Sequence, residues 1–333
     1  MNSFGRLFRI TIFGESHGES VGVNIDGCPA GLPLPVGDFL PDLERRKGGI
    51  RKGTTPRKED DLPIFKSGIF NGVSTGAPIT ILFENNNTRS ADYEQQRAVP
   101  RPGHADFVAN RKFGGFEDYR GGGSFSARLT VGLVAAAVIA KKLLGAAIKV
   151  KADILEVGGE TDIEKGLQKA IDAKDSVGGI IECRVTGLPV GLGEPFFDSV
   201  ESLLAHTALA IPAVRGVEFG TGFAAARMFG SQHNDAIEDM TGHTRTNHAG
   251  GVVGGLTNGN ELVYRIAIKP TSSTPKEQLT LNWETEQLEK FSVKGRHDLC
   301  VALRAPVILE AMTAIVLADL LLLEQRIPRI WTY

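Results

Sequence analysis

The chain has 333 residues, of which 42% are hydrophobic and 23% are charged, so it is long enough for one large or two fused globular domains. The formal net charge of −2 excludes a strong overall attraction to nucleic acid or to an anionic membrane. The three cysteines, Cys28, Cys183 and Cys300, lack metal-ligand spacing, and their odd number argues against a disulfide framework. We therefore expect reduced thiols in a cytoplasmic protein, and no signal peptide, because no continuous apolar stretch follows residues 1–10.

The first half of the chain is expected to begin with strands and to end in a long helix. Residues 7–13 read LFRITIF, and this content of β-branched and aromatic residues is typical of a strand. The long helix stops at Gly145, with Lys141 and Lys142 in its last turns, where cations suit the helix dipole. In chain order we expect strands at 7–13 and 21–25, a short helix at 38–46, a polar basic loop at 48–61, a strand at 79–83, a long loop at 85–104 and the helix from Ser126.

The second half repeats this order of elements at a coarse level. Its most apolar segment, residues 305–323, is interrupted by Glu310, Thr313 and Asp319. Charges at the middle of a bilayer are costly, so this segment is predicted to be a buried core helix, with no membrane contact. The expected elements are strand, helix and strand over 146–181, a helix at 200–210, strands within 216–229 and 252–269, and a long helix at 303–324.

Each half therefore has strands, a loop rich in glycine or histidine, an arginine and one long apolar helix. Arg128 precedes the first long helix and Arg304 precedes the second. Helices that are apolar all round must be covered on both sides, whereas alternating strands need only one buried face. These patterns predict an α+β fold, a β-α-β sandwich of two similar halves with the long helices packed between antiparallel sheets. No linker is evident, so residues 1–333 are predicted to form a single domain.

Two short motifs combine a histidine with turn-forming residues. The first is GESHG, where glycines on both sides of a polar run expose the imidazole of His17. The second is RPGHAD, where Arg101 could bind an anion beside His104. Histidine has an unperturbed pKa of about 6.5, which suits proton transfer near neutrality. Each motif is also compatible with a purely structural turn.

Glycine and hydroxyl groups gather in the later motifs. The run DYRGGGSFSAR at 118–128 resembles a phosphate cradle at a helix start, although it matches neither the P-loop nor the dinucleotide fingerprint. TNHAGG at 246–251 continues to two further glycines, and KPTSST at 269–274 offers a lysine with several hydroxyls. GRHD at 295–298 leads into the last helix, and its aspartate could orient a base or accept a proton. A solvated turn explains each run equally well.

A basic run occupies residues 45–58. It could bind RNA, but it has no interleaved aromatic residues, and Glu59, Asp60 and Asp61 follow at once. A groove for a small polyanion fits this composition better than a nucleic-acid surface, and a solvated loop remains the alternative. Taken together, the motifs are what a doubly anionic substrate and a phosphorylated cofactor would require.

These motifs, in this order, resemble those of the chorismate synthase family, from Phe4 to about Leu323. The resemblance implies a lyase of the shikimate pathway that converts 5-enolpyruvylshikimate 3-phosphate to chorismate and phosphate by anti-1,4-elimination. It also implies a requirement for reduced FMN with no net redox change, a β-α-β sandwich and a homotetramer. NADPH would be used only if the enzyme reduced its own flavin. No nucleic-acid or membrane partner is implied.

The family roles carry over by position. His17 matches the histidine thought to protonate the departing phosphate. His104 matches the histidine that lies beside flavin N1, and Asp298 matches the aspartate thought to relay a proton with flavin N5. The substrate contacts implied by the resemblance are Arg46, Lys52, Arg101 and Arg128. The implied flavin contacts are Ser124, Phe125, Ser126, Pro212, Ala213, Gly254, Lys269, Pro270, Thr271, Ser272, Ser273 and Arg296.

Three positions depart from the family pattern. Ser124-Phe125-Ser126 stands where many members have Arg-Ser-Ser, so one cationic contact to the flavin phosphate is expected to be absent or supplied elsewhere. Lys52 replaces an arginine and loses the bidentate fork, and Pro212 replaces an asparagine. Two other classes stay open: an RNA-binding protein that uses residues 45–58, and a phosphatase with His17 as nucleophile. Flavin-dependent phosphate release would distinguish the three.

Overall fold

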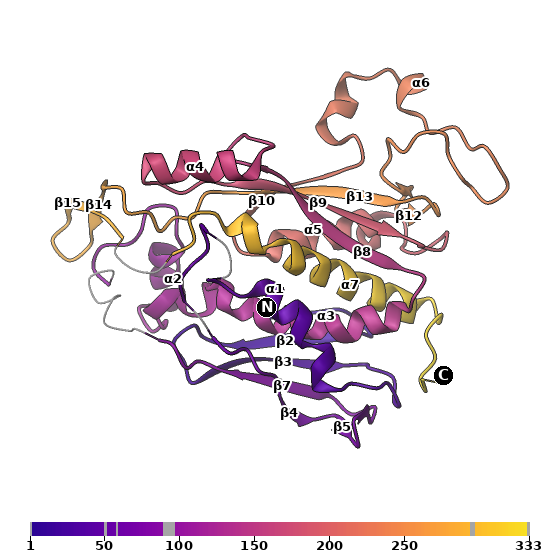
Figure 1. Cartoon of the computed structure of the whole chain (residues 1–333), viewed down its shortest axis with the longest axis horizontal. Helices are drawn as coiled ribbons and strands as arrows, with labels where there is room; N and C mark the ends of the chain where they lie inside the picture. Colours follow the sequence, from indigo (N-terminus) through magenta and orange to yellow (C-terminus); the bar gives the residue numbers. More distant parts are fainter. Residues whose placement is uncertain (1, 50–51, 58, 89–96, 294–296, 332–333) are drawn as a thin grey trace.

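The computed structural model describes the chain except for residues 1, 50–51, 58, 89–96, 294–296 and 332–333. Two antiparallel sheets form the outer layers of the molecule (Figure 1). The first has the strand order β1-β2-β3-β7-β4, with β1 at Ser3–Phe4, β2 at Arg9–Gly14, β3 at Ser20–Asp26, β7 at Ile79–Glu84 and β4 at Ile64–Ser67. The second has the order β10-β13-β9-β8, with β10 at Val214–Phe219, β13 at Leu262–Ile268, β9 at Gly179–Thr186 and β8 at Lys149–Val157.

Alternation of side chains builds the inner face of the first sheet. In β7, Ile79, Ile81 and Phe83 are fully buried, whereas the residues between them are only partly covered. The register pairs Val21 with Phe83 and Val23 with Ile81, so apolar side chains of β3 and β7 form one continuous stripe. Side chains two residues apart lie on the same face of a strand, and this stripe therefore faces the helical layer.

Two long helices, α3 (Thr130–Leu144) and α7 (Pro306–Leu323), lie side by side between the sheets (Figure 1). Every residue from Val307 to Leu321 is buried, and the mean hydropathy of α7 is 2.1. This helix is long and apolar enough to cross a bilayer, but its surface is covered by α3, α5 (Val200–Ala210) and β8. It is a core helix, as the sequence predicted.

The charged side chains of α7 are paired inside the protein. Glu310 accepts hydrogen bonds from Arg45 Nη1 and Nη2 at 2.8 and 2.7 Å and from Lys141 Nζ at 3.0 Å. Asp319 accepts from the backbone N–H groups of residues 6, 7 and 8 at 2.7 to 3.1 Å. Because Arg45 lies on α1 (Leu40–Arg46), the Glu310 contact ties that helix to the core.

The remaining elements connect or flank the three layers. The segment that carries α6 projects from the body of the molecule, and the β14–β15 hairpin lies at the opposite end (Figure 1). These elements are α2 (Asp106–Phe113), α4 (Ile163–Ala173), α6 (Gly230–His233), and the hairpins β5 (Ile69–Phe70) with β6 (Val73–Ser74), β11 (Val252–Val253) with β12 (Leu256–Thr257), and β14 (Gln278–Asn282) with β15 (Gln287–Phe291).

The α+β sandwich with helices between antiparallel sheets is confirmed, and each half consists of a sheet followed by one long helix. Both long helices begin later than expected, each after a 3₁₀ turn. The first was expected from Ser126, but the α-helix begins at Thr130, after a turn at Ala127–Leu129 in which Ser126 caps the backbone N–H of Arg128. The second was expected from Leu303, but α7 begins at Pro306, after a turn at Val301–Arg304. Such turns are frequent at helix N-termini, and the residue pattern does not distinguish them from the α-helix.

Candidate active site

A cavity of about 370 Å³ opens where both long helices begin. The 3₁₀ turns that precede α3 and α7 contribute Arg128 and Arg304 to its lining. The backbone N–H groups at a helix start carry partial positive charge, so two helix dipoles favour an anion here. Among the lining residues, arginines and lysines outnumber the acids. The cavity is therefore suited to a small ligand with several negative charges.

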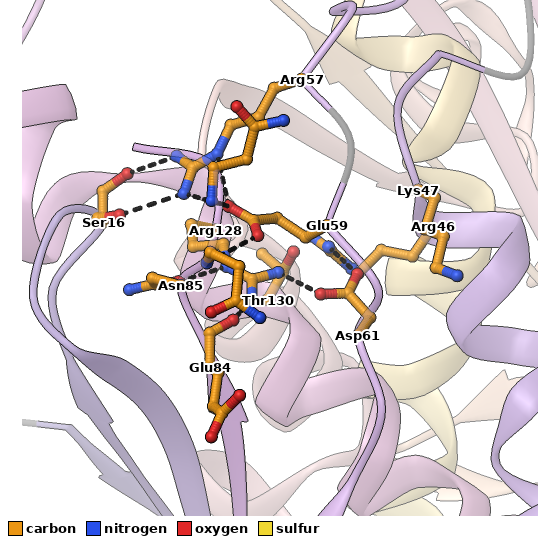
Figure 2. A network of polar contacts seen from close by, with 12 residues as sticks. Ser16, Arg46, Lys47, Arg57, Glu59, Asp61, Glu84, Asn85, Arg128 and Thr130 are labelled. Atoms are coloured by element: carbon orange, nitrogen blue, oxygen red, sulfur yellow. Dashed lines mark hydrogen bonds and ion pairs between the residues drawn. The ribbon is translucent and has the colours of Figure 1, made fainter. Parts of the chain in front are cut away.

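Two buried arginines share one buried carboxylate at the side of the cavity (Figure 2). Arg46 Nη2 donates to Asp61 Oδ2 at 2.6 Å, and Arg128 Nη1 donates to Asp61 Oδ1. Arg128 also donates from Nε to Asn85 Oδ1 at 2.8 Å and from Nη2 to the carbonyl oxygen of Glu84 at 3.1 Å. Burial raises the pKa of Asp61, but the two guanidiniums outweigh it and hold that pKa below its usual value.

The RPGHAD segment forms a second charged cluster. Asp106 accepts from Arg101 Nε at 2.7 Å, from Arg101 Nη2 at 2.8 Å and from His104 Nδ1 at 2.6 Å. Although burial raises the pKa of Asp106, these hydrogen bonds lower it well below the usual range. The carboxylate therefore stays ionised and fixes the orientation of the His104 ring through Nδ1, which Arg101 Nη2 also approaches at 3.0 Å.

The glycine loop of residues 121–123 holds both predicted histidines. A methyl group built on Gly121 would lie 2.6 Å from Cδ2 of His17, and one built on Gly122 would lie 3.3 Å from Cε1 of His104. His104 lines the cavity directly, whereas His17 does not, although its neighbours Ser16 and Gly121 do. The two imidazoles thus pack against one loop, and only glycine allows this close approach.

Arg57 fixes the loop that carries His17. Its Nη1 donates to Ser16 Oγ at 3.0 Å, its Nη2 donates to the carbonyl oxygen of Ser16 at 3.2 Å, and Glu59 Oε1 accepts from Nη2 at 2.7 Å (Figure 2). Burial, followed by the charges of Arg57 and Arg120, lowers the pKa of His17 below its ordinary value. The imidazole is therefore neutral at pH 7 before a ligand binds.

Asp298 belongs to the same cavity. Its Oδ2 accepts from Arg304 Nη2 at 2.7 Å, and its Oδ1 accepts from the backbone N–H of Thr55 at 2.9 Å. Arg304 precedes α7 as Arg128 precedes α3, and each of these arginines pairs with an aspartate of the cavity lining. The similarity of the two halves noted in the sequence thus extends to an arginine–aspartate pair at each helix start.

Comparisons with known proteins agree with this architecture. The family model described as chorismate synthase matches residues 8–322. A chorismate synthase of Chitinophaga pinensis is 71% identical and is aligned over 99% of both chains, and one of Dehalococcoides mccartyi is 46% identical with the same coverage. A solved structure titled as the crystal structure of chorismate synthase has a TM-score of 0.74 and 25% identity, with 96% of this chain and 93% of that chain covered.

The chain belongs to the chorismate synthase family. Membership implies a lyase that acts on a small molecule, and it leaves the RNA-binding alternative for residues 45–58 without support. Arg57, one of the cations of that run, instead contacts Ser16 beside the cavity.

Most residues assigned from the family resemblance surround the cavity. Arg46, Arg101, Arg128, His104 and Asp298 line it. Of the expected flavin contacts, the lining includes Phe125, Ser126, Pro212, Ala213, Lys269, Pro270, Thr271, Ser272 and Ser273. Lys269 Nζ donates to Ser272 Oγ at 2.7 Å and to the carbonyl oxygen of Gly103 at 3.0 Å, which joins the KPTSS segment to the RPGHAD segment.

Four assigned residues that the structure describes do not line this cavity: His17, Lys52, Ser124 and Gly254. Ser124 is exposed, and Gly254 lies in the open turn between β11 and β12. Lys52 lines a neighbouring cavity of about 630 Å³ and donates to Gln168 Oε1 at 3.4 Å. Arg296, which was also assigned, lies outside the described residues.

The residues of the lining fit a bound polar ligand. The buried Arg46 Nε and Thr271 Oγ1 have no hydrogen-bond partner within the described part of the chain. Buried polar atoms are rarely left unpaired, so both atoms are suited to a ligand. A hydroxyl-rich segment beside Lys269 suits a phosphorylated cofactor such as FMN, and this location agrees with the flavin contacts expected for that segment.

Several residues of the site stand outside the motifs that predict it. Arg57 was treated as part of a polyanion groove or solvated loop, and Asp61 was used only to argue against RNA binding. Asn85 and Arg304 received no role in binding. The available signal was the block of acids at 59–61 directly after the basic run, because adjacent blocks of opposite charge can pair with each other.

Proposed function

We propose that this protein converts 5-enolpyruvylshikimate 3-phosphate to chorismate and phosphate by anti-1,4-elimination, with reduced FMN required and no net redox change. One observation carries the proposal: buried arginines and the His104 imidazole line one cavity beside two helix starts, and the glycine loop of that cavity also packs against the His17 imidazole. The substrate has carboxylate and phosphate groups, and a cavity of this charge stabilises them through charge-assisted hydrogen bonds.

Arg46, Arg101 and Arg128 are proposed to hold the substrate anions. Each is buried and anchored by a carboxylate, so its remaining N–H groups are oriented before the substrate arrives. Such preorganisation lowers the free-energy cost of binding and excludes water from the reacting groups. Lys52 has no part in this set, because its ammonium group faces the neighbouring cavity.

His17 is proposed to protonate the departing phosphate. Its pKa is lowered in the unliganded protein, but a phosphate dianion beside the ring would favour the charged imidazolium. Binding of the substrate would thereby draw a proton onto His17 before the C–O bond breaks. The charged acid is then available only when there is a phosphate to receive its proton.

His104 and Asp298 are proposed to manage protons on the flavin side. Asp106 fixes the orientation of the His104 ring through Nδ1, and Arg304 and the Thr55 amide hold the Asp298 carboxylate. The chemistry that reduced flavin supplies when bound is transient electron donation, which helps the phosphate leave next to an unactivated C–H bond. Lys269, Thr271 and Ser273 are proposed to bind its phosphorylated side chain.

The decisive experiment is anaerobic turnover of the substrate with and without reduced FMN, with phosphate, chorismate and flavin oxidation measured together. We expect phosphate release that depends on reduced FMN but consumes no reductant. Oxidation of one flavin per chorismate would refute the absence of net redox change. Phosphate release without flavin, together with a phosphohistidine at His17, would instead support the phosphatase alternative.

Further properties remain predictions, the first from the family resemblance and the other two from the sequence itself. They are the homotetramer, the cytoplasmic location and the single domain over residues 1–333. Use of NADPH is tested by repeating the turnover assay in air with NADPH as the only reductant. Turnover under those conditions would show that the protein reduces its own flavin, and its absence would indicate an external reductase.

A further inference from the structure

Asp61 is a fully buried carboxylate in the wall of the cavity. Its side chain has 0% exposed surface, and the two guanidiniums beside it have 5% and 4%. One oxygen accepts from Arg46 of α1 and the other from Arg128, in the turn before α3 (Figure 2). A single carboxylate therefore sets the spacing between side chains from two separate elements.

The backbone at Asp61 is in a conformation that few residues other than glycine adopt. Its φ is +50°, in the left-handed region where a glycine would be less strained. Aspartate tolerates this region better than most residues, but it still costs more than glycine there. The position is thus occupied at some cost in stability, and the carboxylate is the group that offsets it.

The two arginines depend on Asp61 to different degrees. Arg128 has further acceptors in Asn85 Oδ1 and the carbonyl oxygen of Glu84. For Arg46, Asp61 is the only hydrogen-bond acceptor that the described residues provide, and Arg46 Nε is buried without a partner among them. Burial and the nearby charge of Arg128 lower the pKa of Arg46 to about 10, although Asp61 opposes this shift. Without Asp61, two like charges would be left side by side in a buried wall.

We propose that Asp61 is a positioning residue that holds Arg46 and Arg128 at a fixed spacing, so that both guanidiniums bind the same phosphate or carboxylate group. This inference deepens the proposed function and rests on the anion-binding role given there to both arginines. A positioning role differs from simple charge compensation, because it depends on the length of the side chain as well as on its charge.

Two variants separate these roles. Asp61→Glu keeps the charge but adds one methylene, and it should displace at least one guanidinium. Asp61→Asn removes the charge and presents an amide donor to two other donors. We expect either variant to raise KM for the substrate about 10-fold or more, since losing a well-placed charge-assisted contact commonly has an effect of this size. We also expect inorganic phosphate to raise the Tm of the wild-type protein, and each variant to lose that rise.

Asp319→Asn provides the matched control. Asp319 is a buried carboxylate of α7 that contacts backbone N–H groups at residues 6–8 and does not line the cavity. This variant should lower Tm but keep the wild-type KM and the wild-type response to phosphate. It therefore shows what a general loss of stability does to the assays.

A folded Asp61→Glu variant with KM within about twofold of the wild-type value would overturn the proposal, because charge alone would then suffice. Failure of both Asp61 variants to fold, while Asp319→Asn folds, would also overturn it and make Asp61 a structural residue. If the wild-type protein bound phosphate but did not turn over the substrate, the proposed function would fail. Loss of phosphate binding in Asp61→Glu would still support the positioning role.

Discussion

Replacement of Gly121 by alanine should impair His17 without touching any charged group. The added methyl would lie 2.6 Å from His17 Cδ2 and 2.7 Å from Nε2, whereas ordinary contacts begin at 3.4 Å. The ring must therefore move about 0.8 Å, and a displacement near 1 Å at a reacting group can reduce turnover about 100-fold. Alanine at φ +60° adds strain of about 1–2 kcal/mol to the folded state.

Steady-state phosphate release under anaerobic conditions measures this effect as a fall in kcat of about 10- to 100-fold. Gly159→Ala is the control for strain alone, because Gly159 has φ +82° and open space where its methyl would lie. That variant should lose stability and keep its kcat. In a His17→Ala background, Gly121→Ala should cause little further loss. An equal fall in kcat with and without the His17 imidazole would refute the reasoning.

Three further predictions follow from the charges of the site. Arg101→Ala should raise KM about 10-fold or more while FMN still binds, and an unchanged KM would remove Arg101 from the substrate contacts. Arg57→Gln should raise the pKa of His17, because the Arg57 charge lowers it. The fall in kcat at alkaline pH should then move to higher pH, and an unchanged pH profile of kcat would contradict the role of His17 as an acid. Asp106 has a lowered pKa in the folded protein, so its contribution to stability is present above about pH 4 and lost as pH falls through the folded value. Urea unfolding from pH 7 to pH 2 should show a smaller acid loss for Asp106→Asn than for the wild-type protein.

Much of the fold could be predicted because it depends on local periodicity. The apolar run at 305–323 and the alternating strand at 79–83 each contain their own signal, and the structure has α7 and β7 at these places. The start of α3 could not be read in the same way. Ser126 is a good helix cap and does cap the 3₁₀ turn at Ala127–Leu129, but the residue pattern does not distinguish that turn from the α-helix that begins at Thr130.

The candidate site was predictable only as far as the motifs extended. His17, His104 and Asp298 stand in recognisable runs, but their meeting depends on how the two halves pack, which no local pattern records. The partnership of Asp61 with Arg46 and Arg128 is a contact across 15 and 67 residues of chain. Periodicity does not reveal a contact of this kind, because it is fixed by tertiary packing.

The position of α7 in the chain has a consequence for how the protein is made. A ribosome releases this helix only after both sheets and α3 have emerged, since α7 spans Pro306–Leu323. Until then the inner face of the second sheet and the facing side of α3 lack the helix that covers them, and the nascent chain exposes apolar surface that favours aggregation. Completion of α7 should therefore be the step that commits the chain to its native core. A stop codon before residue 306 should yield insoluble protein, even though it would remove none of the lining residues of the cavity.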